Sequence, residues 1–97
     1  MVKLSVRWTR RALRRIDEIG AYVADDNPSA AARVVSRLIA VGEGLANHPF
    51  RGRIGRVEQT RELVVHGLPY VIVYTLEQDH IAVVTVLHTS RKWPRKF

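Results

Sequence analysis

Apolar and polar residues alternate at the start of the chain. The apolar residues there are Val2, Leu4, Val6 and Trp8, and polar or charged residues stand between them. Successive side chains of a β-strand point to opposite faces, so a strict alternation is typical of a strand with one buried face. We therefore predict a short β-strand over residues 2–8.

The hydrophobic period then changes to that of a helix. Thr9 is suited to cap a helix N-terminus, and apolar residues follow it at spacings of three and four: Ala12, Leu13, Ile16, Ile19, Gly20 and Val23. Asn27 and Pro28 fit the cap and first turn of a second helix, which we expect Pro49 to end. Its apolar residues are Ala31, Val34, Val35, Leu38, Ile39, Val41 and Leu45. Two helices joined so closely should form an antiparallel hairpin.

The second half of the chain has the pattern of a sheet. Residues 50–60, FRGRIGRVEQT, have no regular period and are predicted to form a loop. Three β-type runs follow at 61–66, 70–76 and 81–88, separated by turn-length breaks. The last two are apolar on both parities, which is typical of central strands covered on both faces. The predicted order is β-α-α-β-β-β, in a single domain over residues 1–97.

Composition limits the class of protein. A chain of 97 residues with 46% hydrophobic and 26% charged residues is typical of one globular domain and excludes a disordered chain. No apolar run approaches the ~20 residues that span a bilayer, and we see no signal peptide. The chain has no cysteine, which excludes disulfides and thiolate metal sites. We expect a cytoplasmic protein.

Charge gives the first indication of function. Sixteen Lys and Arg against nine Asp and Glu leave a net charge of +7. Such an excess favours a polyanionic partner, which could be a nucleic acid, the ribosome or an acidic protein. The alternative is a basic surface that only keeps the protein soluble. The first helix carries four arginines, Arg10, Arg11, Arg14 and Arg15, which we interpret as a solvated face in preference to an RNA site.

Five stretches in this order resemble a known family. They are VRWTRRALRRIDEIGAYVADDNPSAA, HPFRGRIGR, TRELVV, LPYVIVYTL and VLHTSRKWP. Each is short and degenerate, but their order and spacing together resemble the RelE/ParE superfamily of toxins from bacterial type II toxin–antitoxin modules, over essentially the whole chain. The resemblance implies an α+β fold in which the N-terminal strand and the helical hairpin pack on a curved antiparallel sheet.

The resemblance also implies partners and two possible activities. A cognate antitoxin would wrap an acidic amphipathic segment around the toxin, in a toxin–antitoxin hetero-oligomer. RelE-like members cut mRNA in the ribosomal A site and arrest translation, whereas ParE-like members inhibit DNA gyrase and lack the nuclease residues. We favour the RelE-like endoribonuclease, with the ParE-like gyrase inhibitor as the alternative.

Candidate nuclease residues follow from the chemistry and from this match. Attack of a 2′-OH on the adjacent phosphate without a metal needs a group that moves protons and cations that bind the charged phosphorane. By match to the family, the catalytic candidates are Arg61, His88 and Arg91. Alternation in the last strand puts His88 on the face of Ala82, Val84 and Val86. The nucleic-acid-binding candidates are Arg51, Arg53, Arg56, Lys92 and Trp93.

Other interpretations of these residues stay open. Many family nucleases have a tyrosine where this chain has Trp93, which could stack on a base but cannot transfer a proton. His88 could be a hydrogen-bonded structural residue, and Arg61 could pair with Glu58 or another carboxylate. No two histidines have metal-ligand spacing, and GRIG is too short for a phosphate loop. We predict neither a metal nor a cofactor.

Overall fold

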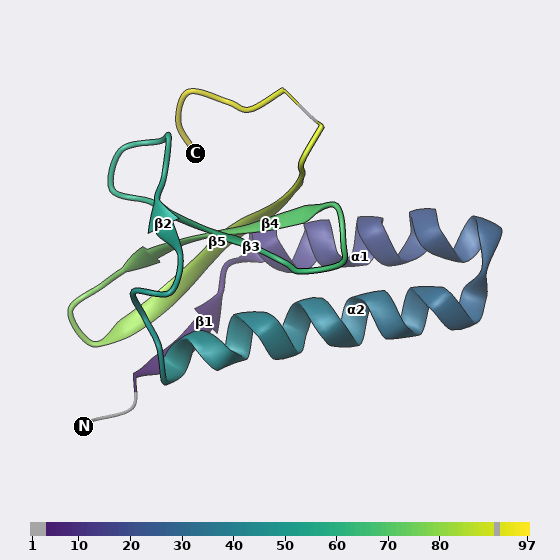
Figure 1. Ribbon diagram of the computed structural model, residues 1–97, viewed down its shortest axis with the longest axis horizontal. Helices are drawn as coiled ribbons and strands as arrows, with labels where there is room; N and C mark the ends of the chain where they lie inside the picture. The colour runs from purple at the N-terminus through teal and green to yellow at the C-terminus, as the bar shows by residue number, and fades with distance from the viewer. Residues whose placement is uncertain (1–3, 91) are drawn as a thin grey trace.

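The computed structural model describes residues 4–90 and 92–97, and its fold is α+β, as predicted. Two helices lie side by side along one side of a five-stranded sheet (Figure 1). The elements follow in the order β1 (Ser5–Trp8), α1 (Arg10–Asp26), α2 (Pro28–Glu43), a short 3₁₀ helix (Gly44–Ala46), β2 (Arg53–Ile54), β3 (Arg61–Val64), β4 (Tyr70–Leu76) and β5 (His80–His88).

Both helices begin at the predicted caps. The side chain of Thr9 accepts a hydrogen bond from the N–H of Ala12, and that of Asn27 accepts one from the N–H of Ala30. The predicted end of the second helix was wrong, because α2 stops at Glu43 and the chain tightens into the 3₁₀ helix before it reaches Pro49. Glycines at 42 and 44 weaken the helix at this point. Neither helix of the described chain is long and apolar enough to cross a membrane.

The sheet has the strand order β1-β5-β4-β3-β2 and is mixed. Strands β2 to β5 pair antiparallel, whereas β1 pairs parallel to β5, with Ser5 opposite His80. The sheet is therefore not antiparallel throughout. The sequence did not reveal the parallel pair, because alternation defines the faces of a strand and not its direction. Strand β2 lies inside the predicted loop 50–60, and its two residues are too few to show a period.

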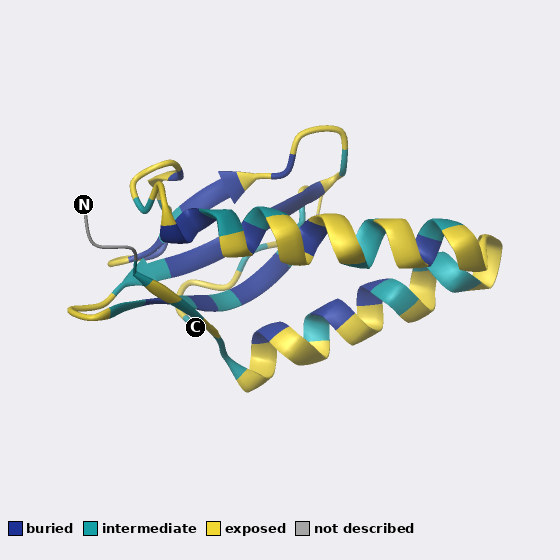
Figure 2. Ribbon diagram, turned by 90° about the horizontal axis from the view of Figure 1, so that it is seen from below, coloured by how far each residue is buried: buried dark blue, intermediate teal, exposed yellow. Residues whose placement is uncertain are grey.

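The core lies between the helical hairpin and one face of the sheet. Buried positions form a stripe on each helix and run along both central strands (Figure 2). The largest fully buried side chains include Leu38, Leu45, Ile72, Tyr74, Ile81, Val83 and Val86. Five successive residues of β4, from Tyr70 to Tyr74, are buried, which confirms that this central strand is covered on both faces.

Candidate functional site

A β-bulge in β5 determines where His88 lies. Val73 of β4 pairs with Thr85, but the next residue, Tyr74, pairs with Val83, so Val84 is an extra residue without a partner on β4. A bulge of this kind exchanges the two faces of the strand beyond it. The core contains Ile81 and Val83 before the bulge and Val86 after it.

The bulge brings His88 to the face of the sheet that bears the helices. His88 pairs with Tyr70 across the strands, and the two rings meet edge to face with their centroids 5.5 Å apart. The predicted grouping of His88 with Ala82 and Val84 was therefore wrong. It assumed an uninterrupted alternation along the strand.

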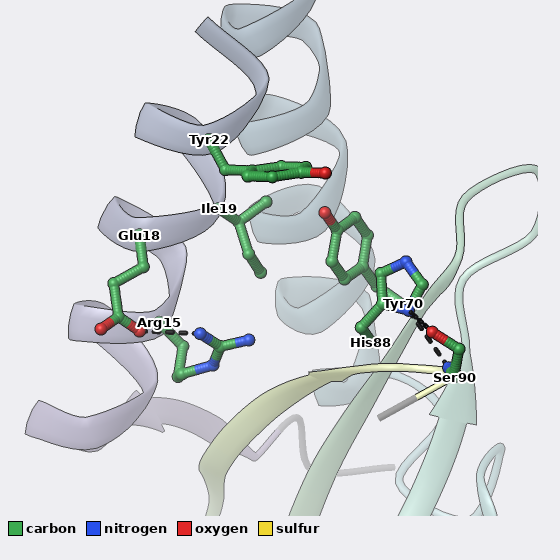
Figure 3. A pocket seen from close by; sticks show the side chains of 7 residues that line it. All are labelled: Arg15, Glu18, Ile19, Tyr22, Tyr70, His88 and Ser90. Atoms are coloured by element: carbon green, nitrogen blue, oxygen red, sulfur yellow. Dashed lines mark hydrogen bonds and ion pairs between the residues drawn. The ribbon is translucent and has the colours of Figure 1, made fainter. Parts of the chain in front are cut away.

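His88 lines a cleft of about 570 Å³ between α1 and the end of the sheet (Figure 3). Its Nδ1 accepts a hydrogen bond from the N–H of Ser90 at 3.1 Å and lies 2.8 Å from Ser90 Oγ. Because that backbone N–H uses the lone pair of Nδ1, the neutral ring carries its proton on Nε2. The other residues that line the cleft are Arg15, Glu18, Ile19, Tyr22 and Tyr70.

The cation of this cleft already has protein partners. Nε of Arg15 donates to the backbone carbonyl of Val86 at 3.0 Å, and its terminal NH1 pairs with Glu18 at 2.7 Å. Arg15 thus ties α1 to β5 beside His88. The described lining contains no second arginine or lysine that could bind a phosphorane.

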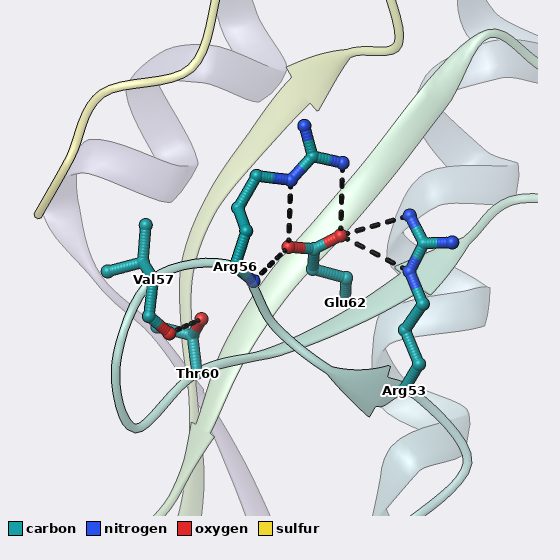
Figure 4. Close-up of polar contacts among 5 residues, drawn as sticks. All are labelled: Arg53, Arg56, Val57, Thr60 and Glu62. Carbon is teal, nitrogen blue, oxygen red and sulfur yellow. Dashed lines mark hydrogen bonds and ion pairs between the residues drawn. The ribbon is translucent and has the colours of Figure 1, made fainter.

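Glu62 organises two of the predicted phosphate contacts. Its side chain is 2% exposed, and it accepts hydrogen bonds from the guanidinium groups of both Arg53 and Arg56 (Figure 4). The backbone N–H of Arg56 also donates to it at 2.8 Å. Burial raises the pKa of Glu62, but these hydrogen bonds and the charge of Arg56 outweigh it and hold the pKa below the usual 4.5. Glu62 therefore stays charged at neutral pH and forms ion pairs with both arginines.

Two predicted nucleic-acid contacts meet each other. The guanidinium carbon of Arg56 lies 3.7 Å from the centroid of the Trp93 ring, in a cation–π stack. Lys92 is exposed and lines a shallow groove with Arg11, Arg14 and Phe97, along α1. The C-terminal residues thus pack against the loop before β3 and against α1.

Arg61 holds the loop that precedes β2. Its NH1 donates to the carbonyl of Gly52 at 2.6 Å and lies 3.5 Å from that of Phe50. These partners are backbone carbonyls, and the predicted alternative of a carboxylate partner was wrong. Arg51 is exposed beside Phe50 on the same loop.

The predicted catalytic residues do not lie together. Arg61 pairs with Tyr74 and His88 with Tyr70, at opposite ends of a stretch of β4. The two pairings are four residue steps apart along β4, an offset of about 13 Å. Arg91 falls outside the described residues. Among the described residues, Glu62 brings Arg53 and Arg56 together at a third place, and Trp93 stacks on Arg56 there.

Sequence reasoning missed Glu62 and the role of Tyr74. Tyr74 Oη accepts from the N–H of Gly52 and donates to the carbonyl of Pro49, both at 2.8 Å. Burial raises the pKa of Tyr74 above 10.0, although the Gly52 hydrogen bond and the charge of Arg61 act against this rise. A single acid inside an apolar strand, next to a loop with three arginines, was the available signal for Glu62.

Comparisons with known proteins agree with the fold. Solved structures of similar shape include the ParDE toxin–antitoxin system of P. aeruginosa, with a TM-score of 0.83 and 22% identity over 93% of this chain and 100% of that one. The RelBE2 complex of Mycobacterium tuberculosis has a TM-score of 0.66 and 22% identity, over 91% and 93%. At these identities the likeness concerns the fold alone.

Sequence relatives show the family. Y4kP of Sinorhizobium fredii, whose name describes a candidate toxin, is 48% identical over 98% of both chains. Toxin RelE2 of Caulobacter vibrioides is 38% identical over 89% of this chain and 96% of its own. The family model described as the ParE toxin of the type II toxin–antitoxin system parDE matches residues 6–93. The chain therefore belongs to the ParE toxin family of type II toxin–antitoxin systems.

Proposed function

We propose that this toxin poisons its target by binding, as a ParE-like inhibitor of DNA gyrase, and does not cleave RNA. The observation that carries the proposal is the separation of the candidate nuclease residues. Arg61 on β3 and His88 on β5 are offset by about 13 Å along the intervening strand β4. A general base and a phosphate-binding cation must both reach one scissile phosphate, but the guanidinium of Arg61 donates to the carbonyl of Gly52 and does not line the cleft of His88.

The chemistry of the individual residues supports the same conclusion. A general base needs a free lone pair, and that of His88 Nδ1 accepts the N–H of Ser90. The cations next to RNA must be free to bind phosphate, but Arg53 and Arg56 pair with the buried Glu62. The RelE-like endoribonuclease, which the sequence favoured, thus has less support than its alternative.

We further propose that a cognate antitoxin neutralises the toxin. The structural relatives are components of ParDE and RelBE2 toxin–antitoxin systems, and the net charge of +7 favours an acidic partner. The groove along α1, lined by Arg11, Arg14 and Lys92, is a basic surface that an acidic segment could follow. The complex is a hetero-oligomer of toxin and antitoxin.

The experiment compares the two activities on one preparation. Purified toxin is added to a DNA gyrase supercoiling assay and, in parallel, to a ribosomal translation reaction whose mRNA ends are mapped. We expect supercoiling to be inhibited and the mRNA to stay intact. The antitoxin, added in equimolar amount, should restore supercoiling. Codon-positioned mRNA cuts with normal supercoiling would refute the proposal in favour of the nuclease.

A further inference from the structure

The loop before β2 exposes two large apolar side chains. Phe50 is 69% exposed and Ile54 is 80% exposed, which makes Ile54 the most exposed large hydrophobic residue of the described chain. A large apolar side chain in water is not informative alone, but two on one short loop form a patch. A hollow of about 640 Å³ adjoins Phe50, and its lining residues are Asn47, His48, Pro49, Phe50 and Arg51.

Arg61 joins the two side chains into one surface. Its guanidinium carbon lies 5.0 Å from the centroid of the Phe50 ring, and Ile54 is its direct partner between β2 and β3. Directly opposed residues of an antiparallel pair share a face, with Cβ atoms about 5 Å apart. Phe50, Arg51, Ile54 and Arg61 form what we name the Phe50 patch.

The backbone beneath the Phe50 patch is held in place from inside. Tyr74 Oη bridges the carbonyl of Pro49 and the N–H of Gly52, and Arg61 binds the carbonyl of Gly52. Gly52 has no room for a side chain, because an added Cβ would lie 2.7 Å from Tyr74 Oη and 2.9 Å from the backbone O of Glu62. The loop thus presents its apolar side chains in a fixed geometry, which lowers the entropic cost of binding.

The chemistry of the Phe50 patch indicates the partner. No acidic residue occurs between Glu43 and Glu58, so the patch combines an aromatic ring, an aliphatic side chain and arginine cations. Aromatic residues and arginine are the types that dominate protein–protein hot spots. An exposed isoleucine adds nothing to phosphate binding and cannot stack on a base, which favours a protein over a nucleic acid. The complementary surface is an apolar pocket ringed by carboxylates.

We propose that the Phe50 patch is the surface by which the toxin binds the protein that it poisons, at an apolar pocket ringed by carboxylates. This inference rests on the proposed function and names the binding residues for it. Phe50 and Ile54 fill the apolar pocket, Arg51 faces the carboxylates, Arg61 joins the two apolar side chains, and Tyr74 positions the loop from inside.

The test removes the apolar side chains without touching the core. The Phe50→Ser/Ile54→Ser toxin is compared with wild type for binding to purified DNA gyrase and for inhibition of supercoiling. We expect a dissociation constant raised by roughly 30-fold or more, the usual effect of losing a hot spot. The matched control is Leu13→Ser/Ile39→Ser, which removes exposed apolar side chains from the helices (51% and 41% exposed) and should leave binding unchanged. Circular dichroism and thermal unfolding verify the fold of both.

A second variant tests the charge of the partner. Arg51→Glu should slow association with gyrase at low salt, and the difference from wild type should shrink as salt is raised, because the exposed charges are then screened. An unchanged association rate would refute the acidic character of the partner.

The outcomes separate the inference from the proposed function. If wild-type toxin does not bind gyrase, the proposed function fails and this inference fails with it. If wild type binds gyrase and the Phe50→Ser/Ile54→Ser toxin binds equally well, only the inference is overturned. A nitrocellulose filter assay with single-stranded RNA completes the test. Wild-type RNA binding that this double variant loses would make the Phe50 patch a nucleic-acid surface and would also overturn the inference.

Discussion

The guanidinium of Arg56 stacks on the indole of Trp93, with its central carbon 3.7 Å from the ring centroid. The sequence indicates both residues as candidate contacts to RNA, Arg56 to phosphate and Trp93 to a base, although it favours packing over base stacking for Trp93. In the folded protein the two side chains stack on each other, and Arg56 also forms an ion pair with the buried Glu62. A cation already paired with a carboxylate and stacked on an aromatic ring has fewer N–H groups left for a phosphate.

Glu62→Gln tests this network through stability. The change removes the negative charge that Arg53 and Arg56 share, and we expect the free energy of unfolding at neutral pH to fall by about 1–3 kcal/mol. Urea unfolding measures the loss. The matched control is Glu58→Gln on the neighbouring turn, where the carboxylate is exposed and the change should have little effect. Equal stability of Glu62→Gln and wild type would contradict the role of Glu62.

The same network predicts a direction for the pH dependence of stability. The pKa of Glu62 is lowered in the folded protein from its usual 4.5. Its stabilisation is therefore complete above pH 4.5 and is lost as the pH falls through the lower pKa of the folded state. The stability difference between wild type and Glu62→Gln should shrink in acid. A difference that grows on acidification would show that the sign of the pKa shift is wrong.

Tyr74→Phe tests how the Phe50 patch is positioned. The change removes only the hydroxyl that binds Pro49 and Gly52, and we expect a loss of about 1–2 kcal/mol of unfolding free energy together with weaker gyrase inhibition. Tyr22→Phe is the control, because Tyr22 is 75% exposed. If Tyr74→Phe is measurably destabilised but inhibits gyrase fully, the loop geometry that the Tyr74 hydroxyl maintains is not needed for inhibition.

Tyr74 also predicts an effect of alkaline pH. Because its pKa is raised above 10.0 in the folded protein, the neutral phenol stabilises the fold below pH 10.0 and this contribution is lost as the pH rises through the folded pKa. In Tyr22→Phe, ultraviolet titration should show tyrosinate still forming at pH values above the range in which exposed tyrosines ionise. This high-pH ionisation step should be absent in Tyr74→Phe.

His88→Ala separates the two toxin activities. For a toxin that acts by binding, we expect His88→Ala to fold and to arrest growth as wild type does. Loss of a catalytic general base would instead reduce RNA cleavage by roughly 10²–10⁴-fold. Induced expression with growth curves measures the effect, and an uninduced culture serves as the non-toxic reference. Loss of toxicity in a folded His88→Ala protein would contradict the proposed gyrase inhibitor and support the RelE-like nuclease.

Association with the antitoxin should depend strongly on salt. A partner attracted by the net charge of +7 should associate at least about ten-fold more slowly as the salt rises from roughly 0.01 to 1 M, because the Debye length falls from about 30 to 3 Å. Stopped-flow fluorescence measures the rate. Arg10→Gln/Arg14→Gln removes two exposed charges from α1 and should flatten the dependence. A rate that does not change with salt would exclude electrostatic steering.

Local signals determined much of this fold. A helix cap depends on a side chain and a backbone N–H three residues apart, so Thr9 and Asn27 were identified from the sequence alone. The stripes that bury Ile16, Ile19 and Leu38 follow from the helical period, and the apolar run of β4 follows from burial on both faces. Each of these properties is contained within one element.

Long-range strand pairing determined which residues the arginines contact. Arg53 meets Glu62 because β2 pairs with β3 in one particular register, and a two-residue strand leaves no period in the sequence that would reveal it. The direction of β1 depends in the same way on a partner more than seventy residues later, since Ser5 lies opposite His80. Alternation tells which face of a strand is buried, but it contains no information about which strand lies beside it.

The position of His88 depended on one residue that has no signature of its own. Alternation along β5 assigns His88 to the face of Val84, and this holds only while every residue of the strand has a partner. Tyr74 pairs with Val83 and Val73 with Thr85, so Val84 is skipped and the faces exchange. A bulge forms where it lets both strands keep their hydrogen bonds and their buried side chains, a balance that is set by packing across the whole sheet. The sequence alone therefore placed a histidine at the end of a strand, and the tertiary structure turned it towards α1.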